Sequence, residues 1–264
     1  MPEQDNPSTL LADRKATKEK IDRFVSLGKP IVEGSNLTDE SSELTDADVE
    51  VTRNLLQVIA PVSPENSSLH AHLELTARFA RRIGEELKTQ DPEKYQDLNL
   101  SELEILGLIH DIGRFFTHRW LRNELVATQF LKKLGVRQDF IANIPSELNY
   151  LGKNPNATEI LDSTVTEMPL AHKIIEMADF CGKRKPDGGI ATFDETMQYH
   201  RSSRGNYQQL IGQMPAWPSE RKLGPNFIDF SAKIYLKLRD DFGIAGIDFE
   251  KIRLGILDEE KNGL

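Results

Sequence analysis

The spacing of apolar residues along the chain predicts helices almost throughout. Apolar side chains recur at intervals of three and four residues, the period of a helix with one buried face, in segments 10–28, 46–60, 68–88, 122–134 and 227–242. No segment alternates apolar and polar residues as a half-buried strand would, and there is no internal repeat. The pattern therefore predicts an all-α protein.

One helical segment is apolar on nearly every side. Residues 103–116 read LEILGLIHDIGRFF, a composition that predicts a helix deep in the core. Ser101 and Glu104 have the spacing of a capping box at its start. The segment carries His110 and Asp111 into the core, where polar side chains are costly unless they are paired or bind a metal.

Helical phase separates two neighbouring histidines in segment 68–88. Intervals of three and four from His72 reach an apolar stripe that includes Phe79 and Ile83, whereas the same intervals from His70 reach a mostly charged face. His72 is therefore predicted to be buried and His70 exposed, so that one metal ion does not easily take both. Taken alone, His72 is either a core histidine bonded to a carbonyl or a metal ligand.

A later helix brings another carboxylate to an apolar face. The segment PLAHKIIEMADFCGKRK has an inward stripe that includes Ile175 and Ala178, and Asp179 lies at the edge of that stripe. An aspartate in this position is either a structural partner for a cation or a ligand. His172 lies two turns earlier, about 10 Å along the helix axis, so we expect it to line the same cleft without binding the same ion.

Two segments look irregular. Residues 33–50 contain seven acidic residues and no basic one, which indicates a solvated linker, with a contact for a basic partner as the alternative. Residues 181–222 are rich in glycine and proline and locally basic, which is typical of a functional or mobile loop. Gly28 and Pro30 are expected to close the first helix, and Asp248 to cap the last one.

Composition narrows the class of protein. The net charge of −9 argues against general affinity for nucleic acid or an anionic membrane. The single cysteine, Cys181, excludes an internal disulfide framework and fits a reducing compartment. The chain has no secretory signal pattern and no apolar run of 18 residues. We therefore expect a cytoplasmic protein that has no membrane partner.

The order His72, His110-Asp111, Asp179 resembles that of the HD-domain superfamily of metal-dependent phosphohydrolases. HLELTARFARRIG looks like the first family helix, and ILGLIHDIGRF is similar to the family's apolar helix ending in His-Asp-x-Gly-Lys, with Arg114 in the lysine position. KIIEMADFCGKR looks like the helix that carries the last aspartate. The resemblance covers about residues 50–185 and is specific as a set.

The resemblance implies an all-α bundle with a metal site between helices, extended by helices at both ends. Residues 1–45 would form an N-terminal extension, with a disordered start, one helix and the acidic linker. Residues 46–190 would form the HD-like metal-binding domain. Residues 191–264 would add the irregular basic loop and C-terminal helices that pack on the same domain.

The resemblance also implies a ligand set and a reaction. One divalent ion (Mn²⁺, Fe²⁺, Co²⁺, Ni²⁺, Zn²⁺ or Mg²⁺) would be held by His72, His110, Asp111 and Asp179. It would activate a single water for hydrolysis of a phosphate ester in a small phosphorylated substrate, a nucleotide being one candidate. Catalytic roles fall to Asp111 and Arg114. The expected substrate contacts are Arg114, His118, Lys183 and Arg184.

Departures from the family pattern restrict the reaction. Relatives with two metals add two histidines before the last aspartate, but here Asn123 takes the first of these places and no histidine lies between His118 and His172. This favours one metal over an oxygenase with two. The segment IGRFF also lacks the Glu-Asp pair of the alarmone hydrolases. Since no general acid is obvious beside His110, a non-catalytic or regulatory HD module is the alternative. The sequence is also compatible with a homo-oligomer.

Overall fold

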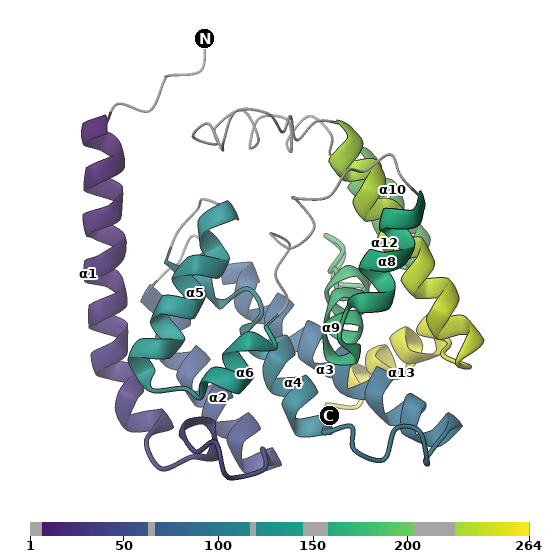
Figure 1. Ribbon diagram of the computed structural model, residues 1–264, viewed down its shortest axis with the longest axis horizontal. Helices are drawn as coiled ribbons and strands as arrows, with labels where there is room; N and C mark the ends of the chain where they lie inside the picture. Colours follow the sequence, from purple (N-terminus) through teal and green to yellow (C-terminus); the bar gives the residue numbers. More distant parts are fainter. Residues whose placement is uncertain (1–6, 63–66, 117–119, 145–157, 203–224, 264) are drawn as a thin grey trace.

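The computed structural model describes residues 7–62, 67–116, 120–144, 158–202 and 225–263, and these residues form eleven α-helices and no strand (Figure 1). The predicted all-α class is confirmed. The α-helices are α1 (Pro7–Val32), α2 (Asp46–Ile59), α3 (Ser67–Gln90), α4 (Leu100–Ile109), α5 (Trp120–Leu134), α6 (Gln138–Ala142), α8 (Thr158–Glu167), α9 (Leu170–Cys181), α10 (Phe193–Ser202), α12 (Pro225–Ile244) and α13 (Phe249–Lys261). Three 3-10 helices lie between them: η1 (Asn36–Thr38), η2 (Ala60–Val62) and η4 (Ile112–Phe115).

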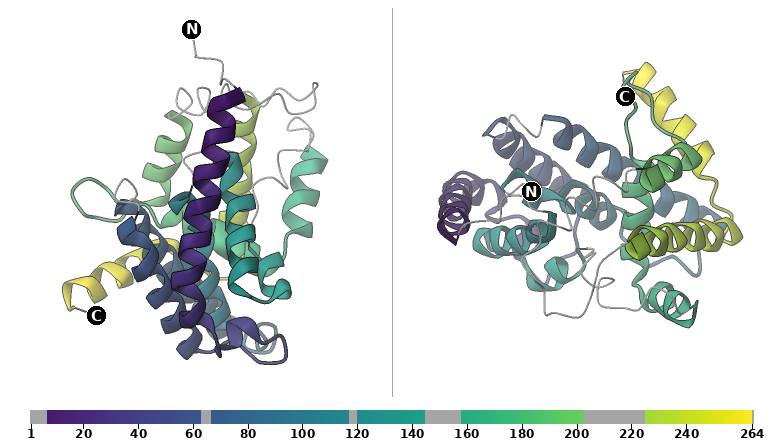
Figure 2. Two further views of the ribbon diagram at one scale, coloured as in Figure 1. Left: turned by 90° about the vertical axis from the view of Figure 1, so that its left-hand side faces the viewer. Right: turned by 90° about the horizontal axis from the view of Figure 1, so that it is seen from above.

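Helices α3 and α4 lie in the middle of the molecule, and α9 packs against both (Figure 1). On one side, α2 packs on α4 and α1 packs on α2 and α5. On the other side, α12 contacts α8, α9 and α10, while α13 packs on α3. Helices α1 and α12 thus stand at opposite ends, as the view from above shows (Figure 2, right). One hydrophobic core joins these parts, from Ile21 and Phe24 of α1 to Ile252 and Ile256 of α13.

Helix α4 is buried as its sequence predicts. Every residue from Leu103 to Ile109 is buried. The helix lies close to α3 at Gly107, where a β-carbon would lie only 2.6 Å from the Cα atom of Ala77. Such a contact is far inside van der Waals distance, so only glycine allows the two helices this separation.

The start of α4 differs from the expected capping box. Asn99 is the N-cap, and its side-chain oxygen accepts a hydrogen bond from the Glu102 N–H at 2.9 Å. Glu104 does not reach back to the backbone, because its buried carboxylate accepts hydrogen bonds from Arg53 of α2 and Arg81 of α3. Ser101 instead donates to Asp46. The capping-box prediction is therefore wrong: ion pairs between helices take the two side chains.

The first helix and the acidic segment also differ from expectation. Helix α1 continues through Pro30 to the fully buried Val32, and the turn that follows contains Gly34 at a φ of 81°. Proline lacks only its own N–H donor, and the turn is still completed after it, because the Glu33 N–H donates to the Lys29 carbonyl oxygen at 3.0 Å. The acidic segment that follows is not a plain solvated linker, since its Asp48 is buried and accepts the Asn36 and Thr45 N–H groups, both at 2.9 Å.

A helix occupies part of the segment expected to be irregular. Helix α10 begins after Thr192, whose hydroxyl accepts from the Glu195 N–H while the Glu195 carboxylate accepts from the Thr192 N–H. This is a capping box, and the spacing of Thr192 and Glu195, three residues apart, is its signature in the sequence. The rest of the expected basic loop, residues 203–222, lies outside the described residues. At the last helix, Asp248 caps α13 as predicted.

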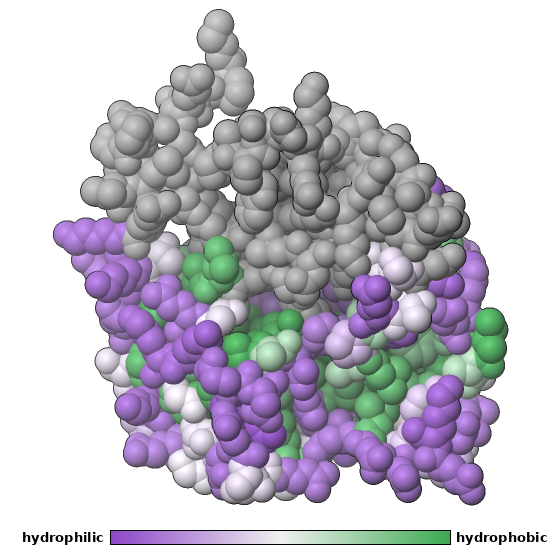
Figure 3. Space-filling view, viewed as in Figure 1, coloured by the Kyte–Doolittle hydropathy of each residue, from purple (hydrophilic) through white to green (hydrophobic). Residues whose placement is uncertain are grey.

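In the part of the face that Figure 3 colours, the side chains are mainly hydrophilic, with hydrophobic ones between them. Among the residues that the structure describes, no helix combines the length and apolar character needed to cross a membrane.

Candidate metal centre

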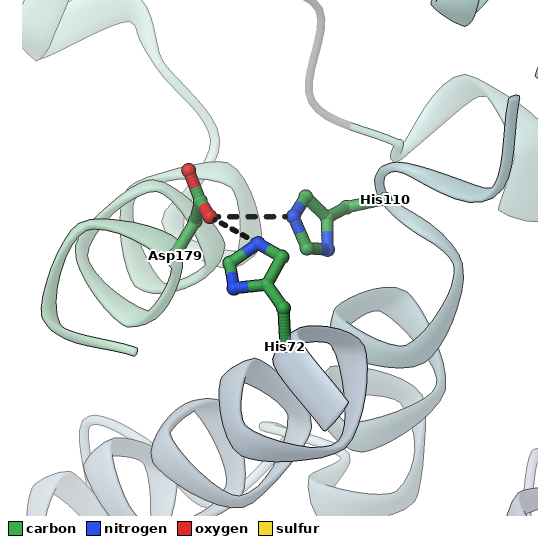
Figure 4. Close-up of side chains that lie close together, drawn as sticks. All are labelled: His72, His110 and Asp179. Carbon is green, nitrogen blue, oxygen red and sulfur yellow. Dashed lines mark ion pairs between the residues drawn. The ribbon is translucent and has the colours of Figure 1, made fainter. Parts of the chain in front are cut away.

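Three side chains from separate helices converge near the middle of the molecule. His72 lies on α3, His110 follows the last residue of α4, and Asp179 lies on α9; Figure 4 shows them pointing toward one another. Asp179 Oδ1 lies 2.8 Å from His72 Nε2 and 3.5 Å from His110 Nε2. Each residue offers one ligand atom, and these atoms all lie within 4.8 Å of one another.

The turn of α3 places only one of its two neighbouring histidines in this group. The His72 side chain is 15% exposed and faces Asp179. The His70 side chain is 34% exposed, and its Nε2 lies 3.7 Å from the carboxylate of Glu74, one turn along α3. The helical phase read from the sequence therefore gives the correct order of burial, but His70 is half-buried and not fully exposed, and its Nε2 atom is buried.

Backbone carbonyls set the proton positions of both imidazoles. His72 Nδ1 lies 3.1 Å from the Gly182 carbonyl oxygen, and His110 Nδ1 lies 2.8 Å from that of Gly107. Because a carbonyl only accepts, each Nδ1 must donate, and in a neutral imidazole this leaves a lone pair on Nε2. Both Nε2 atoms are buried, and the oxygen that faces them is Asp179 Oδ1.

The donor atoms fit a divalent cation. Two Nε2 lone pairs and a carboxylate oxygen face one another, an arrangement that is repulsive unless a proton or a cation lies among them. Ligand atoms on one transition metal are about 3–4 Å apart, since metal–ligand bonds are about 2.1 Å long. The separations around Asp179 Oδ1, 2.8 and 3.5 Å, are close to this range.

The surrounding charges keep the carboxylate ionised. Burial acts to raise the pKa of Asp179, but Lys183 and the two imidazoles hold that pKa well below its usual range. Burial, assisted by Lys183, lowers the pKa of His72 and so favours its neutral form. Burial acts the same way on His110, but the hydrogen bond to Asp179 and the charge of Asp111 raise its pKa instead.

Asp111 lies beside the three-residue group. It occupies the junction of α4 and η4, and its Oδ2 is 3.8 Å from His110 Nε2. The same oxygen accepts a hydrogen bond from Arg114 Nη1 at 2.7 Å. Arg114, for which a catalytic role and a substrate contact are expected, thus binds a carboxylate at the edge of the centre.

The other expected site residues are placed differently. Lys183 Nζ lies 2.7 Å from Asp179 Oδ1, at the centre of the group. Arg184 instead pairs with Glu260 of α13, at 2.9 Å, and with the Gly188 carbonyl oxygen. His172 is buried and is not one of the three grouped residues, in agreement with the expectation that it does not bind the same ion. His118 lies outside the described residues, as does the side chain of Asn123.

Two glycines have roles that we did not foresee. A β-carbon on Gly182 would lie 2.8 Å from the Ala178 carbonyl oxygen and 3.1 Å from Thr76 Oγ1, so its small size lets the chain pass close to His72. Gly107 does the same between α3 and α4. For Gly107 the sequence offers a signal, a glycine inside an otherwise apolar helix, which usually has a packing or functional reason.

Cys181 should be unreactive while the fold is intact. Burial raises the pKa of this thiol to about 12, and the charge of Asp179 acts in the same direction. Since the thiolate is the reactive form, we expect no alkylation by iodoacetamide at pH 8 in the native protein and full alkylation in urea, measured by mass spectrometry. Rapid native alkylation would contradict the packing of the end of α9.

A known family matches the segment of the chain that carries this centre. The family model of the HD domain matches residues 69–179, a segment that begins shortly before His72 and ends at Asp179. HD domains generally bind divalent metals, and most are metal-dependent hydrolases. Comparisons with curated proteins and with solved structures gave no match.

Proposed function

Because residues 69–179 form an HD domain, we propose that this protein is a metal-dependent phosphohydrolase. Its substrate would be a small phosphate ester, with nucleotides as the first candidates. A single observation carries the proposal: His72 and His110 each turn Nδ1 to a backbone carbonyl and Nε2 toward the Asp179 carboxylate, and the three ligand atoms lie within 4.8 Å of one another.

The residues of the centre would have different roles in this reaction. His72, His110 and Asp179 would hold the ion, and Asp111, 3.8 Å from His110 Nε2, is a candidate fourth ligand. The bound ion would supply Lewis acidity and a coordinated water of lowered pKa. Arg114, whose side chain is 46% exposed, would orient Asp111 and face the solvent side, where an anionic substrate approaches.

An assay of metals and substrates tests the proposal. The purified protein would be tested with nucleotides and simple phosphate esters in the presence of Mn²⁺, Co²⁺, Ni²⁺ or Mg²⁺, while released phosphate is measured. We expect metal-dependent phosphate release that a chelator abolishes. Tight binding of metal without release of phosphate from any ester would instead favour a non-catalytic or regulatory HD module.

Asp179→Asn should lower both metal occupancy and phosphate release. The substitution removes the negative charge at the centre of the group but keeps the shape of the side chain. We expect a loss of about 100-fold or more in metal affinity, since even residues that only support a ligand are worth about 10–100-fold. Asp194→Asn is the control, because Asp194 is 92% exposed on α10 and pairs weakly with Arg239 at 3.9 Å. Equal metal affinity in the two variants would refute the role of Asp179.

A further inference from the structure

Asp179 Oδ1 is shared between the candidate metal ligands and a lysine. This oxygen lies 2.8 Å from His72 Nε2 and 2.7 Å from Lys183 Nζ. Lys183 follows Asp179 by one helical turn, just beyond the end of α9. An ammonium group and a metal ion are both cations, so at this oxygen they are alternatives for the same negative charge.

The backbone of Lys183 is held in place while its side chain is partly exposed. The Ala191 N–H donates to the Lys183 carbonyl oxygen at 2.8 Å, within a short turn closed by the bridge between Arg184 and Ile190. Helix α13 fixes this turn, because Arg253 donates to the Ile190 carbonyl oxygen at 3.1 Å. The Lys183 side chain is 40% exposed. It can therefore swing on its flexible stem without moving the turn.

Charges around the centre balance in pairs. Asp179 is matched by Lys183 and Asp111 by Arg114, each basic residue lying one helical turn or less after its carboxylate. A divalent cation added to such a balanced set would leave an excess of two positive charges. The excess positive charge repels the Lys183 ammonium group and so weakens its ion pair with Asp179. The same charge attracts an anion to the centre.

We propose that Lys183 and a divalent cation compete for Asp179 Oδ1, and that the displaced ammonium group then binds the phosphate of the substrate. The second half rests on the proposed phosphohydrolase function, whereas the first half requires only a cation at this centre. Lys183 is then a switch between two anionic partners. It neutralises the carboxylate before the cation arrives and contacts the substrate afterwards.

Titration with Mn²⁺ tests the competition. Calorimetry would compare the wild-type protein with Lys183→Met and with the control Lys185→Met. Lys185 is a suitable control because it lies in the same turn, is 36% exposed and pairs with Glu195 instead. We expect Lys183→Met to bind Mn²⁺ about fivefold more tightly, the factor that an ion pair of about 1 kcal/mol corresponds to. Lys185→Met should bind it as the wild type does.

Inorganic phosphate provides the second measurement. In the presence of saturating Mn²⁺, Lys183→Met should bind phosphate at least about fivefold more weakly than the wild type or Lys185→Met does. The two effects have opposite signs, which separates a switch from a structural role, since a damaged site would bind both Mn²⁺ and phosphate more weakly. Lys183→Gln would replace the methionine variant if circular dichroism shows that the latter is unfolded.

The outcomes distinguish this proposal from the proposed function. Unchanged or weaker Mn²⁺ binding in Lys183→Met would refute the competition, and unchanged phosphate binding would refute the second contact. If both shifts occur but no ester is hydrolysed, the switch stands and the phosphohydrolase function fails. Absence of Mn²⁺ binding in every variant would refute both.

Discussion

Replacing His72 with alanine should abolish the binding of divalent metal, whereas replacing His70 should leave bound metal unchanged. His72 Nε2 lies 2.8 Å from Asp179 Oδ1, while His70 lies on another face of α3 next to Glu74. Loss of one of three convergent ligands should reduce metal affinity by more than the roughly 10–100-fold that supporting residues provide. Elemental analysis after dialysis would measure the metal bound by each variant.

The His70 variant is the matched control, because both substitutions remove an imidazole from the same helix two residues apart. Thermal unfolding of the metal-free proteins would show that each variant still folds. Loss of metal from His70→Ala with retention in His72→Ala would mean that α3 is rotated from the orientation described. The same analysis would count the ions, and we expect one per chain.

Replacing Gly107 with alanine should both destabilise the fold and weaken metal binding. The new β-carbon would meet the backbone of Ala77, with the Cα atom at 2.6 Å and the nitrogen at 2.8 Å, so α4 would have to move away from α3. Overpacking of this kind costs about 1–3 kcal/mol. Because His72 lies on α3 and His110 at the end of α4, the shift should also separate the two imidazoles. Urea unfolding and metal titration would measure the two effects.

Gly84→Ala is the control for this experiment, since Gly84 lies at the same helix interface. Its new β-carbon would meet only the ends of the Leu103 and Leu100 side chains, at 2.7 and 2.8 Å, which can rotate away. Alanine also favours helix by about 1 kcal/mol over glycine, so this variant should be nearly as stable as the wild type or more so. If Gly107→Ala had the same stability and metal affinity as the wild type, the close approach of α4 to α3 would not be needed for the fold or for the metal site.

The helices that carry the site could be predicted because their patterns are local. The apolar period of α3 separates His72 from His70, and the uninterrupted apolar run of α4 predicts its burial. Helix ends were less predictable, because partners distant in sequence decide them. Glu104 had the spacing of a capping residue, yet arginines on two other helices bind it.

The contrast between local patterns and contacts distant in sequence also explains which parts of the site could be predicted. The order of residue types and the resemblance to HD domains predict His72, His110, Asp111 and Asp179 as ligands, and the structure groups His72, His110 and Asp179. The pairing of Arg184 with Glu260 joins residues 76 positions apart, and no local pattern reports such a contact. The hydrogen bond between Arg114 and Asp111 joins residues three positions apart. It still could not be predicted, because it depends on the change from α4 to the 3-10 helix η4 at this point of the chain.

The carbonyl groups that orient His72 and His110 protect this part of the centre from side-chain substitutions. Many metal-binding histidines are oriented by a carboxylate that a single substitution can delete. Here the acceptors belong to the main chain at positions 182 and 107, so every amino acid at these positions would supply the same oxygen. Selection can act on the two positions only through the size of the side chain. The acceptors themselves could be removed only by altering the backbone, for example by chemical synthesis.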